Sequence, residues 1–183
     1  MSNIATSRIL CAPESGRSTS PACNRSGWVW PLPRLDGTAP CLLSPFRVRL
    51  PDSIELGYWG RSPSLDLVPV FAAQDGTIAY AGADHGTSTL CIDHAGGWST
   101  QYSELAHVLA RPTDRFRRRR KERVRAGDVV GHAPRASSRV RFALSHVTNE
   151  ACLIVDPTER MATWSILPWF TKEASASQSS RTA

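Results

Sequence analysis

The alternation of apolar and polar residues between positions 66 and 105 constrains the fold of this chain more than any other feature. Apolar side chains recur at alternate positions in three runs, at 68–72, 78–80 and 90–92. A period of two residues is typical of strands that bury one face. Glycines separate the runs at turn-like intervals, at Gly76, Gly86, Gly96 and Gly97. We therefore expect three or four short antiparallel strands joined by tight turns.

The length and the composition of the two ends indicate a single domain. The 183 residues are enough to bury a hydrophobic core. Residues 1–26 are rich in Ser, Pro and Arg without a hydrophobic period, and residues 171–183 form a tail rich in Ser and Ala. Both segments are expected to be disordered, which leaves a domain over residues 27–170. No apolar run approaches the ~20 residues of a membrane-spanning helix. No secretory signal is visible, so the compartment stays unassigned.

The positive charge of the chain is concentrated in one segment. The formal net charge is +6, and residues 111–125 alone hold nine basic and two acidic residues. The rest of the chain is therefore close to neutral, and residues 111–125 are interpreted as a basic insertion within the domain. The five cysteines are scattered and include no C-x-x-C pair. Neither a zinc knuckle nor a disulfide framework is expected from them.

Several sequence blocks, taken in order, carry a resemblance to a known family. They are Asp66-Leu67, residues 68–78, Ala81-Gly82, residues 91–94, residues 99–102, residues 124–131 and Phe142. These blocks resemble the lysostaphin-like, or LytM-domain, zinc metalloendopeptidases, a bacterial family that cuts peptidoglycan cross-bridges in the cell wall. The resemblance covers residues 28–157. It implies a mainly β fold, an antiparallel LytM-type β-sandwich that is also called the duplicated hybrid motif.

The resemblance also assigns five functional positions. In the family, zinc is held by the His and Asp of an H-x-x-x-D motif and by the second His of an H-x-H motif. The first His of H-x-H and the His of a Y-x-H-L motif assist catalysis. In this chain Asp66 matches the ligand Asp, whereas Ser62 stands in place of the first His. Glu104 replaces the His of Y-x-H-L, and Arg139 and Arg141 replace the H-x-H pair.

These replacements predict that the former active site binds no metal. Residues two apart on a strand face the same side, so Arg139 and Arg141 are expected to point together into the groove. A guanidinium stays protonated and has no acceptor lone pair, so it repels a divalent cation. We expect Glu104 and Asp66 to form ion pairs with the two arginines and, with Tyr102, to line a binding groove. Zinc is expected only if this interpretation is wrong.

The leading hypothesis is a degenerate, non-catalytic LytM-type domain. Degenerate LytM domains in the family regulate other cell-wall hydrolases by binding a partner protein. The resemblance therefore implies binding of peptidoglycan, or of an envelope protein partner, through the former active-site groove. Arginine suits such ligands because it binds carboxylates in a bidentate manner. The alternative within the same family is an active zinc metalloendopeptidase that cleaves peptidoglycan peptides.

A further alternative is binding of nucleic acid or another acidic surface through the Arg-rich segment 115–125. The basic patch consists of Arg115, Arg117, Arg118, Arg119, Arg120, Lys121 and Arg123. Such a cluster neutralises phosphates and gives an affinity that falls with salt. Phe116 is the one aromatic residue within this segment, so the sequence offers no stacking platform for bases.

The histidines offer no second metal site in the sequence. They are His85, His94, His107, His132 and His146. No two of them share a ligand-like spacing such as H-x-H or H-x-x-x-H. His94 occupies the turn of the family's D-H-G block and is expected to be a turn residue.

Overall fold

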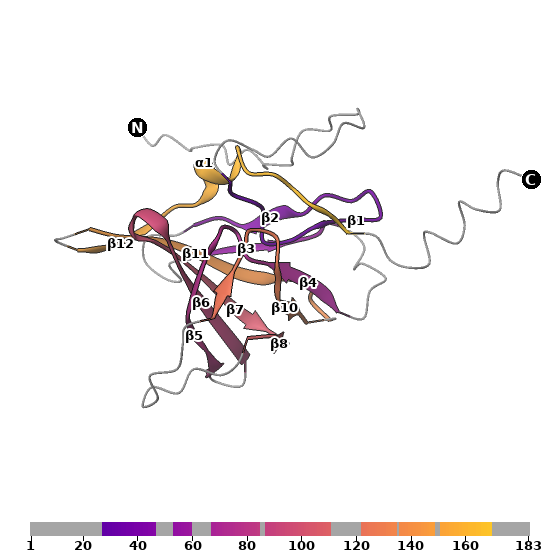
Figure 1. Cartoon of the computed structure of the whole chain (residues 1–183). Helices are drawn as coiled ribbons and strands as arrows, with labels where there is room; N and C mark the ends of the chain where they lie inside the picture. Colours follow the sequence, from indigo (N-terminus) through magenta and orange to yellow (C-terminus); the bar gives the residue numbers. More distant parts are fainter. Residues whose placement is uncertain are drawn as a thin grey trace, which may run out of the picture.

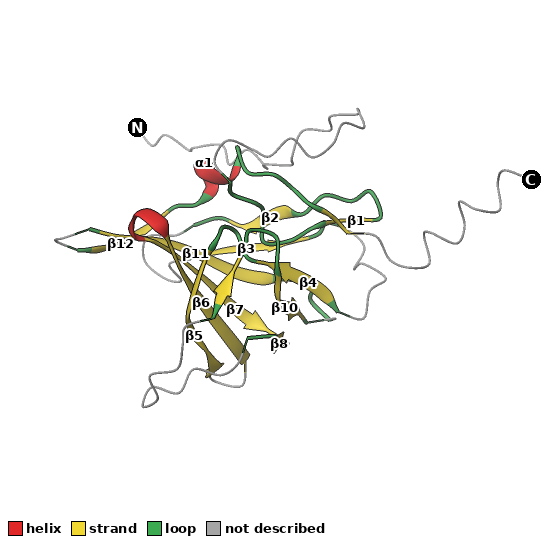
Figure 2. Cartoon of the chain, in the orientation of Figure 1, coloured by secondary structure: helices red, strands yellow, loops and turns green. Residues whose placement is uncertain are grey.

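The regular secondary structure of the described residues is almost entirely β. The computed structural model describes residues 27–46, 53–59, 67–84, 87–110, 122–134, 136–148 and 151–169. Helical structure in these ranges is limited to one 3-10 turn, η1 (Ala95–Gly97), and one short helix, α1 (Thr158–Met161) (Figure 2). The predicted mainly β, antiparallel fold is therefore confirmed. The predicted disordered ends and most of the basic insertion, residues 111–121, lie outside the described residues.

The largest sheet has eight strands (Figure 1). Seven of them follow the order β2-β3-β11-β7-β6-β5-β9, and β12 also pairs with β11. Every pairing in this sheet is antiparallel. The strands are β2 (Cys41–Ser44), β3 (Ile54–Gly57), β5 (Gly76–Asp84), β6 (Thr87–His94), β7 (Trp98–Leu105), β9 (Arg123–Val124), β11 (Val140–Val147) and β12 (Cys152–Val155). Because β7 occupies one edge of β11, β3 and β12 share the other edge, one at each end of the strand.

Two smaller sheets complete the domain. A three-stranded sheet has the order β4-β10-β8, and β1 pairs with β13 in parallel. Their strands are β4 (Val68–Phe71), β10 (Val129–Ala133), β8 (His107–Val108), β1 (Arg34–Leu35) and β13 (Pro168–Trp169). The strands predicted between positions 66 and 105 are present as β4, β5, β6 and β7. However, β4 pairs with β10 and not with β5, its neighbour in sequence.

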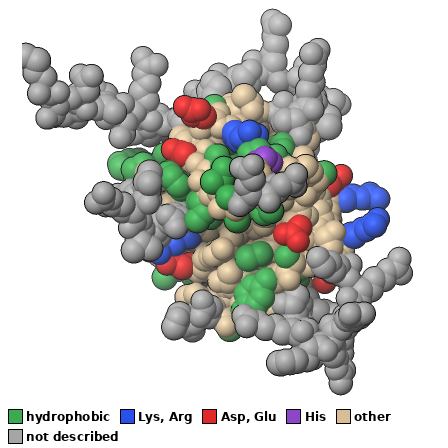
Figure 3. Space-filling model, turned by 90° about the vertical axis from the view of Figure 1, so that its left-hand side faces the viewer, with side chains coloured by type: hydrophobic (Ala, Val, Ile, Leu, Met, Phe, Trp, Pro, Cys, Tyr) green, Lys and Arg blue, Asp and Glu red, His purple; other side chains and the backbone are tan. Residues whose placement is uncertain are grey.

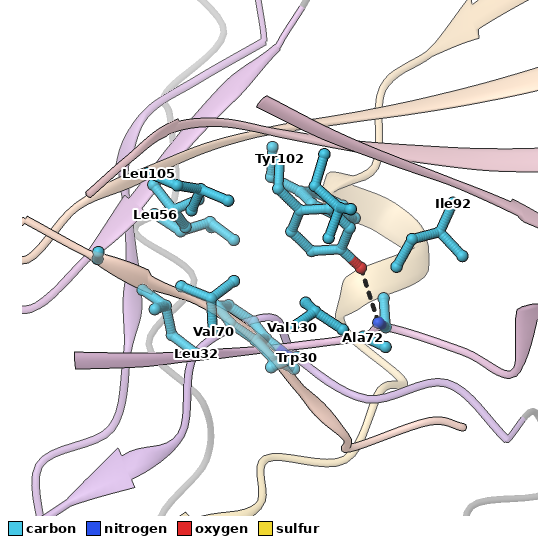
Figure 4. Packing of buried hydrophobic residues seen from close by; sticks show 14 of the residues in the cluster. Trp30, Leu32, Leu56, Val70, Ala72, Ile92, Tyr102, Leu105 and Val130 are labelled. Carbon is cyan, nitrogen blue, oxygen red and sulfur yellow. Dashed lines mark hydrogen bonds between the residues drawn. The ribbon is translucent and has the colours of Figure 1, made fainter. Parts of the chain in front are cut away.

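The hydrophobic core joins the inner face of the large sheet to the three-stranded sheet (Figure 4). On β11 the alternate residues Val140, Phe142 and Leu144 are fully buried, as the period of two predicts. They meet Tyr102 from β7 and Val70 from β4 in the same cluster. Burying each large side chain of this kind contributes about 1.5–3 kcal/mol. The alternation therefore fixes which face of each strand looks outward.

The two ends of the described chain pack against each other above the large sheet (Figure 1). Trp28 stacks on Trp164 with a ring-centroid distance of 4.7 Å. The indole Nε1 of Trp30 donates a hydrogen bond to the carbonyl of Met161 at 3.0 Å. Through these contacts Trp28, Trp30 and Trp164 become part of the hydrophobic core. Within the described ranges, no helix has the length and hydrophobicity needed to cross a membrane.

Candidate functional site

Two arginines, Arg139 immediately before β11 and Arg141 within it, lie on the outward face of the large sheet. Arg141 lies between the buried residues Val140 and Phe142 in sequence, so its side chain emerges on the opposite face. Its Cα partner on β3 is Glu55, which faces the same way. Arg139 bonds to this same Glu55. Both arginines therefore project from one side of the sheet, and their place in a binding groove stays a prediction.

Both arginines are held in ion pairs. Arg139 Nη1 lies 3.0 Å from Glu55 Oε1, and Arg141 Nε lies 3.0 Å from Glu104 Oε1. The predicted pair between Arg141 and Glu104 is thus present. The side chains remain partly open, with exposures of 51% and 26% in the first pair and 45% and 43% in the second. Pairs exposed to this degree contribute only ~0–1 kcal/mol each, so a ligand can displace them at little cost. We call the surface around Glu55, Glu104, Arg139 and Arg141 the arginine face.

Glu55 was missed by the sequence analysis. The alternation in Ile54-Glu55-Leu56 places its side chain outward, because Ile54 and Leu56 are buried. That alternation could have been read from the sequence. The identity of the neighbouring strand could not, since β3 and β11 are more than 80 residues apart in the chain, as the 84-residue separation of Glu55 and Arg139 shows.

Glu104 reaches Arg141 from a bulge in β7. Its backbone φ is 62°, in the left-handed region that few residues other than glycine adopt. The β6–β7 register shifts here, because Leu90 pairs with Tyr102 whereas Ser88 pairs with Leu105. Bulges of this kind redirect a side chain and are frequent beside functional sites. The left-handed conformation costs roughly 1–2 kcal/mol, so the fold maintains this orientation of Glu104 against local strain.

Tyr102 is a core residue and does not line the arginine face. Its side chain is fully buried, which corrects its assignment to the groove. The hydroxyl oxygen accepts a hydrogen bond from the Ala73 N–H at 2.7 Å (Figure 4). Burial raises the pKa of Tyr102 to about 12, so the phenol is neutral at physiological pH. The residue alternates with its neighbours on β7, and this alternation already placed it on the same face as the buried Thr100.

His94 extends the same buried network and is structural. Its Nδ1 lies 2.9 Å from the carbonyl oxygen of Asp75, and its Nε2 lies 2.7 Å from Thr100 Oγ1. A carbonyl only accepts, so Nδ1 carries the proton and Nε2 accepts from the threonine hydroxyl. Burial lowers the pKa of His94 below its ordinary value of 6.5, which keeps the ring neutral. His94, which the sequence predicted in a turn, is therefore the last residue of β6, and its side chain is hydrogen-bonded to the turn between β4 and β5.

The fold brings two other histidines together. His107 on β8 and His132 on β10 are Cα partners, although 25 positions separate them in the sequence. Burial and the nearby His107 both lower the pKa of His132. In the part of the chain that the structure describes, no third His, Cys, Asp or Glu joins them to form a group that could hold a metal. His146 stacks on Trp98 at 4.3 Å, and His85 lies outside the described residues.

Some predicted site residues cannot be placed. Ser62 and Asp66 lie outside the described residues, as do Arg115 to Lys121 of the basic patch. Arg123 is described and is exposed at the start of β9. The predicted ion pair of Asp66 and the nucleic-acid role of the basic patch therefore stay predictions.

Comparisons with known proteins find a family likeness over the middle of the chain. Residues 65–151 match the model of peptidase family M23. Over this stretch the chain is similar to the lysostaphin-like, LytM-domain endopeptidases, and Asp66 alone keeps the residue type of a functional position. No curated protein matches the chain by sequence.

Solved structures share the fold at low sequence identity. A chain of the SpoIIQ–SpoIIIAH pore forming complex is 16% identical, with a TM-score of 0.52 over 86% of this chain and 99% of that chain. CbpA from L. salivarius REN is 15% identical, with a TM-score of 0.52 over 75% of this chain and 95% of that chain. The catalytic domain of lysostaphin from Staphylococcus simulans is 14% identical, with a TM-score of 0.46 over 68% and 92% of the two chains. At these identities the likeness to the first two structures shows the fold alone.

The residues of the arginine face do not fit the zinc ion on which the family depends. Arg139 and Arg141 occupy the positions of the H-x-H pair and have no lone pair to donate to a metal. The carboxylate of Glu104 is engaged by Arg141 at 3.0 Å. A zinc ion at this place would meet two positive charges where the family chemistry needs two neutral imidazoles.

Proposed function

We propose that this chain is a non-catalytic M23 domain that binds a carboxylate-bearing cell-wall ligand through the arginine face. The ligand is the peptide stem of peptidoglycan or an acidic segment of an envelope protein. One observation carries the proposal: the ion pair between Arg141 and Glu104, at 3.0 Å, stands where the family has a metal ligand and a catalytic histidine. An ionised side-chain pair stands in place of the hydrolytic centre, and its guanidinium can exchange the Glu104 carboxylate for a carboxylate of a ligand.

The half-exposed ion pairs support exchange with a ligand. Arg139 and Arg141 each already bind one carboxylate, at 3.0 Å in both cases. A ligand carboxylate replaces Glu55 or Glu104 without leaving a bare charge, because the displaced glutamate remains close to solvent. Guanidinium groups also offer further N–H donors for bidentate binding. The arginine face is therefore suited to reversible recognition of carboxylates.

The protein-partner form of the ligand has one further motivation. A chain of the SpoIIQ–SpoIIIAH pore forming complex shares this fold, so an M23-like fold occurs in a protein assembly. That likeness concerns the fold alone. Co-sedimentation with peptidoglycan would favour the peptide stem as the ligand, and its absence would favour the acidic protein segment.

The test combines metal analysis with binding. The full chain is purified, exposed to excess zinc, dialysed and analysed for metal by mass spectrometry, and its co-sedimentation with insoluble peptidoglycan is measured. We expect no stoichiometric zinc and a bound fraction that falls at least five-fold in the double variant Arg139→Gln/Arg141→Gln. Arg123→Gln removes an exposed arginine elsewhere on the large sheet and serves as the matched control.

The outcomes separate the alternatives. Stoichiometric zinc with release of soluble fragments would replace the proposal with an active metalloendopeptidase. Binding that is indifferent to Arg139 and Arg141 would remove the arginine face from the proposal. A parallel titration with duplex DNA tests the nucleic-acid alternative. Tight DNA binding with a steep salt dependence, and no binding to peptidoglycan, would favour the basic patch.

A further inference from the structure

The hairpin of β11 and β12 exposes an apolar edge strand. Within the described residues β12 pairs with β11 alone, and its other edge carries unpaired backbone N–H and C=O groups. The strand reads Cys-Leu-Ile-Val and contains neither a charged residue nor a proline. Leu153 is 53% exposed and Ile154 is 47% exposed, and Val147 opposite the strand is 52% exposed. Natural proteins normally protect such edges with lysine, proline or a bulge, so an open apolar edge indicates an interaction site.

The hairpin is held rigidly in this exposed position. At its tip the Thr148 N–H donates to the Ala151 carbonyl at 2.9 Å, and the Ala151 N–H donates to Thr148 Oγ1 at 3.2 Å. One residue pair before the last pair of the ladder, His146 stacks on Trp98 at 4.3 Å, and the Arg160 guanidinium lies 4.0 Å above the Trp98 ring. Figure 1 shows β12 projecting from the body of the domain, and Figure 3 shows hydrophobic side chains gathered around histidine and basic side chains on that end of the molecule. Because the strand is ordered before binding, little conformational entropy is lost when a partner docks.

We propose that β12 pairs with β12 of a second copy of this chain, in an antiparallel and two-fold symmetric arrangement. Open backbone groups of an edge strand are satisfied by another extended strand, which makes β-augmentation the matching mode of binding. A two-fold axis perpendicular to the sheet brings identical faces together, and residues opposite each other in an antiparallel pair share a face. The apolar strand is complementary to itself under this operation.

The side-chain pattern selects one register. Leu153 shares a face with His146, its Cα partner, while Cys152 and Ile154 face the other side. Only residues of the same face can meet, so one allowed register centres on Leu153 and sets Cys152 against Ile154 of the second copy. The next allowed register centres on Ile154 and would set Cys152 against Asp156. The first register is favoured because all of its central contacts are apolar. A four-residue pairing buries a small area, so the expected dimer is weak, with a Kd of about 10 µM to 1 mM.

This inference is independent of the proposed function. The arginine face surrounds the first residues of β11, whereas β12 pairs with its last residues, Leu144 to Val147. A dimer formed through β12 leaves Arg139 and Arg141 open. Failure of one proposal therefore does not decide the other.

Sedimentation-velocity ultracentrifugation of the full chain tests the dimer. Between about 10 µM and 1 mM we expect a concentration-dependent shift from monomer to dimer, and we expect Leu153→Lys to weaken the association at least ten-fold. Leu109→Lys is the matched control, since Leu109 is 55% exposed on the connection between β8 and the basic insertion. Circular dichroism verifies that each variant keeps its strands.

A cross-linking experiment tests the register. Ile154→Cys is expected to form a disulfide with the native Cys152 of the second copy under mild oxidation, because opposed residues lie about 4.5–5.5 Å apart at Cα. Adding Cys152→Ser should abolish the covalent dimer. A monomer over the whole concentration range would overturn the proposal and leave a different protein's extended segment as the occupant of β12. A dimer that Leu153→Lys leaves unchanged, without the disulfide, would overturn it equally.

Discussion

The buried hydroxyl of Tyr102 provides a quantitative test of how this core is held together. Its oxygen accepts the Ala73 N–H at 2.7 Å and lies 3.3 Å from Thr100 Oγ1. Tyr102, Ala73 and Thr100 have no exposed surface. Tyr102→Phe keeps the ring and its packing but removes the acceptor. The Ala73 N–H is then buried with no partner, in a place that water does not reach.

The magnitude follows from this geometry. A buried donor that loses its acceptor costs about 1–3 kcal/mol, and the apolar contacts of the ring are retained. We therefore expect Tyr102→Phe to lower the free energy of unfolding by about 2 kcal/mol. For a domain of this size, that corresponds to a decrease in Tm of roughly 4–8 °C.

Urea unfolding followed by tryptophan fluorescence measures this change, with differential scanning calorimetry for the Tm. Tyr80→Phe is the matched control, because Tyr80 is partly exposed, and a loss below about 0.5 kcal/mol is expected for it. Equal effects of the two substitutions would refute the reasoning. The hydroxyl of Tyr102 would then contribute no more than an ordinary surface group.

Three further predictions concern pH, strain and metal. Burial lowers the pKa of His94, so the contribution of His94 to stability is complete above pH 6.5 and declines below pH 6.5, where only the unfolded chain takes up the proton. Urea titrations between pH 7.5 and 5 should show this loss of stability. A His94→Gln variant whose stability declines equally steeply would contradict the prediction. Glu104→Gly should unfold with about 1 kcal/mol more stability than Glu104→Ala, because only glycine relieves the φ of 62°; equal stabilities in urea would argue against backbone strain. EDTA should leave the Tm within 1 °C of its value in zinc-containing buffer, because only a metal that binds the folded state raises the Tm. A larger decrease in EDTA would reveal a structural metal.

The sequence alone determined the class of the fold and the face on which each strand residue lies. The apolar residues Val140, Phe142 and Leu144 alternate with polar or small ones, which is typical of a strand with one buried face, and all three are buried. The same alternation places Arg141 on the outward face. Periodicity carries this information because side chains alternate across a strand whatever its neighbours are. The loss of zinc donors was also readable, since arginine has no lone pair in any fold.

At Tyr102 the family motif and the alternation along the strand gave opposite predictions. Tyr102 was assigned to the groove because of its place in a family motif, although its alternation with Thr100 indicated the buried face. The structure follows the alternation, and Tyr102 is fully buried. Physical periodicity along β7 was the better guide to this residue than the motif.

Only the tertiary structure decided which strands became neighbours, and therefore which side chains meet. The pairing of β11 with β3 supplies Glu55 to Arg139, and the pairing of β8 with β10 brings His107 to His132. The bulge that turns Glu104 toward Arg141 depends on the β6–β7 register. Long-range pairing and register are set by the packing of the whole core and not by local preference, since sheet hydrogen bonds are the same for every sequence. The open edge of β12 has the same origin, because a strand is an edge only when the finished sheet leaves it without a second neighbour.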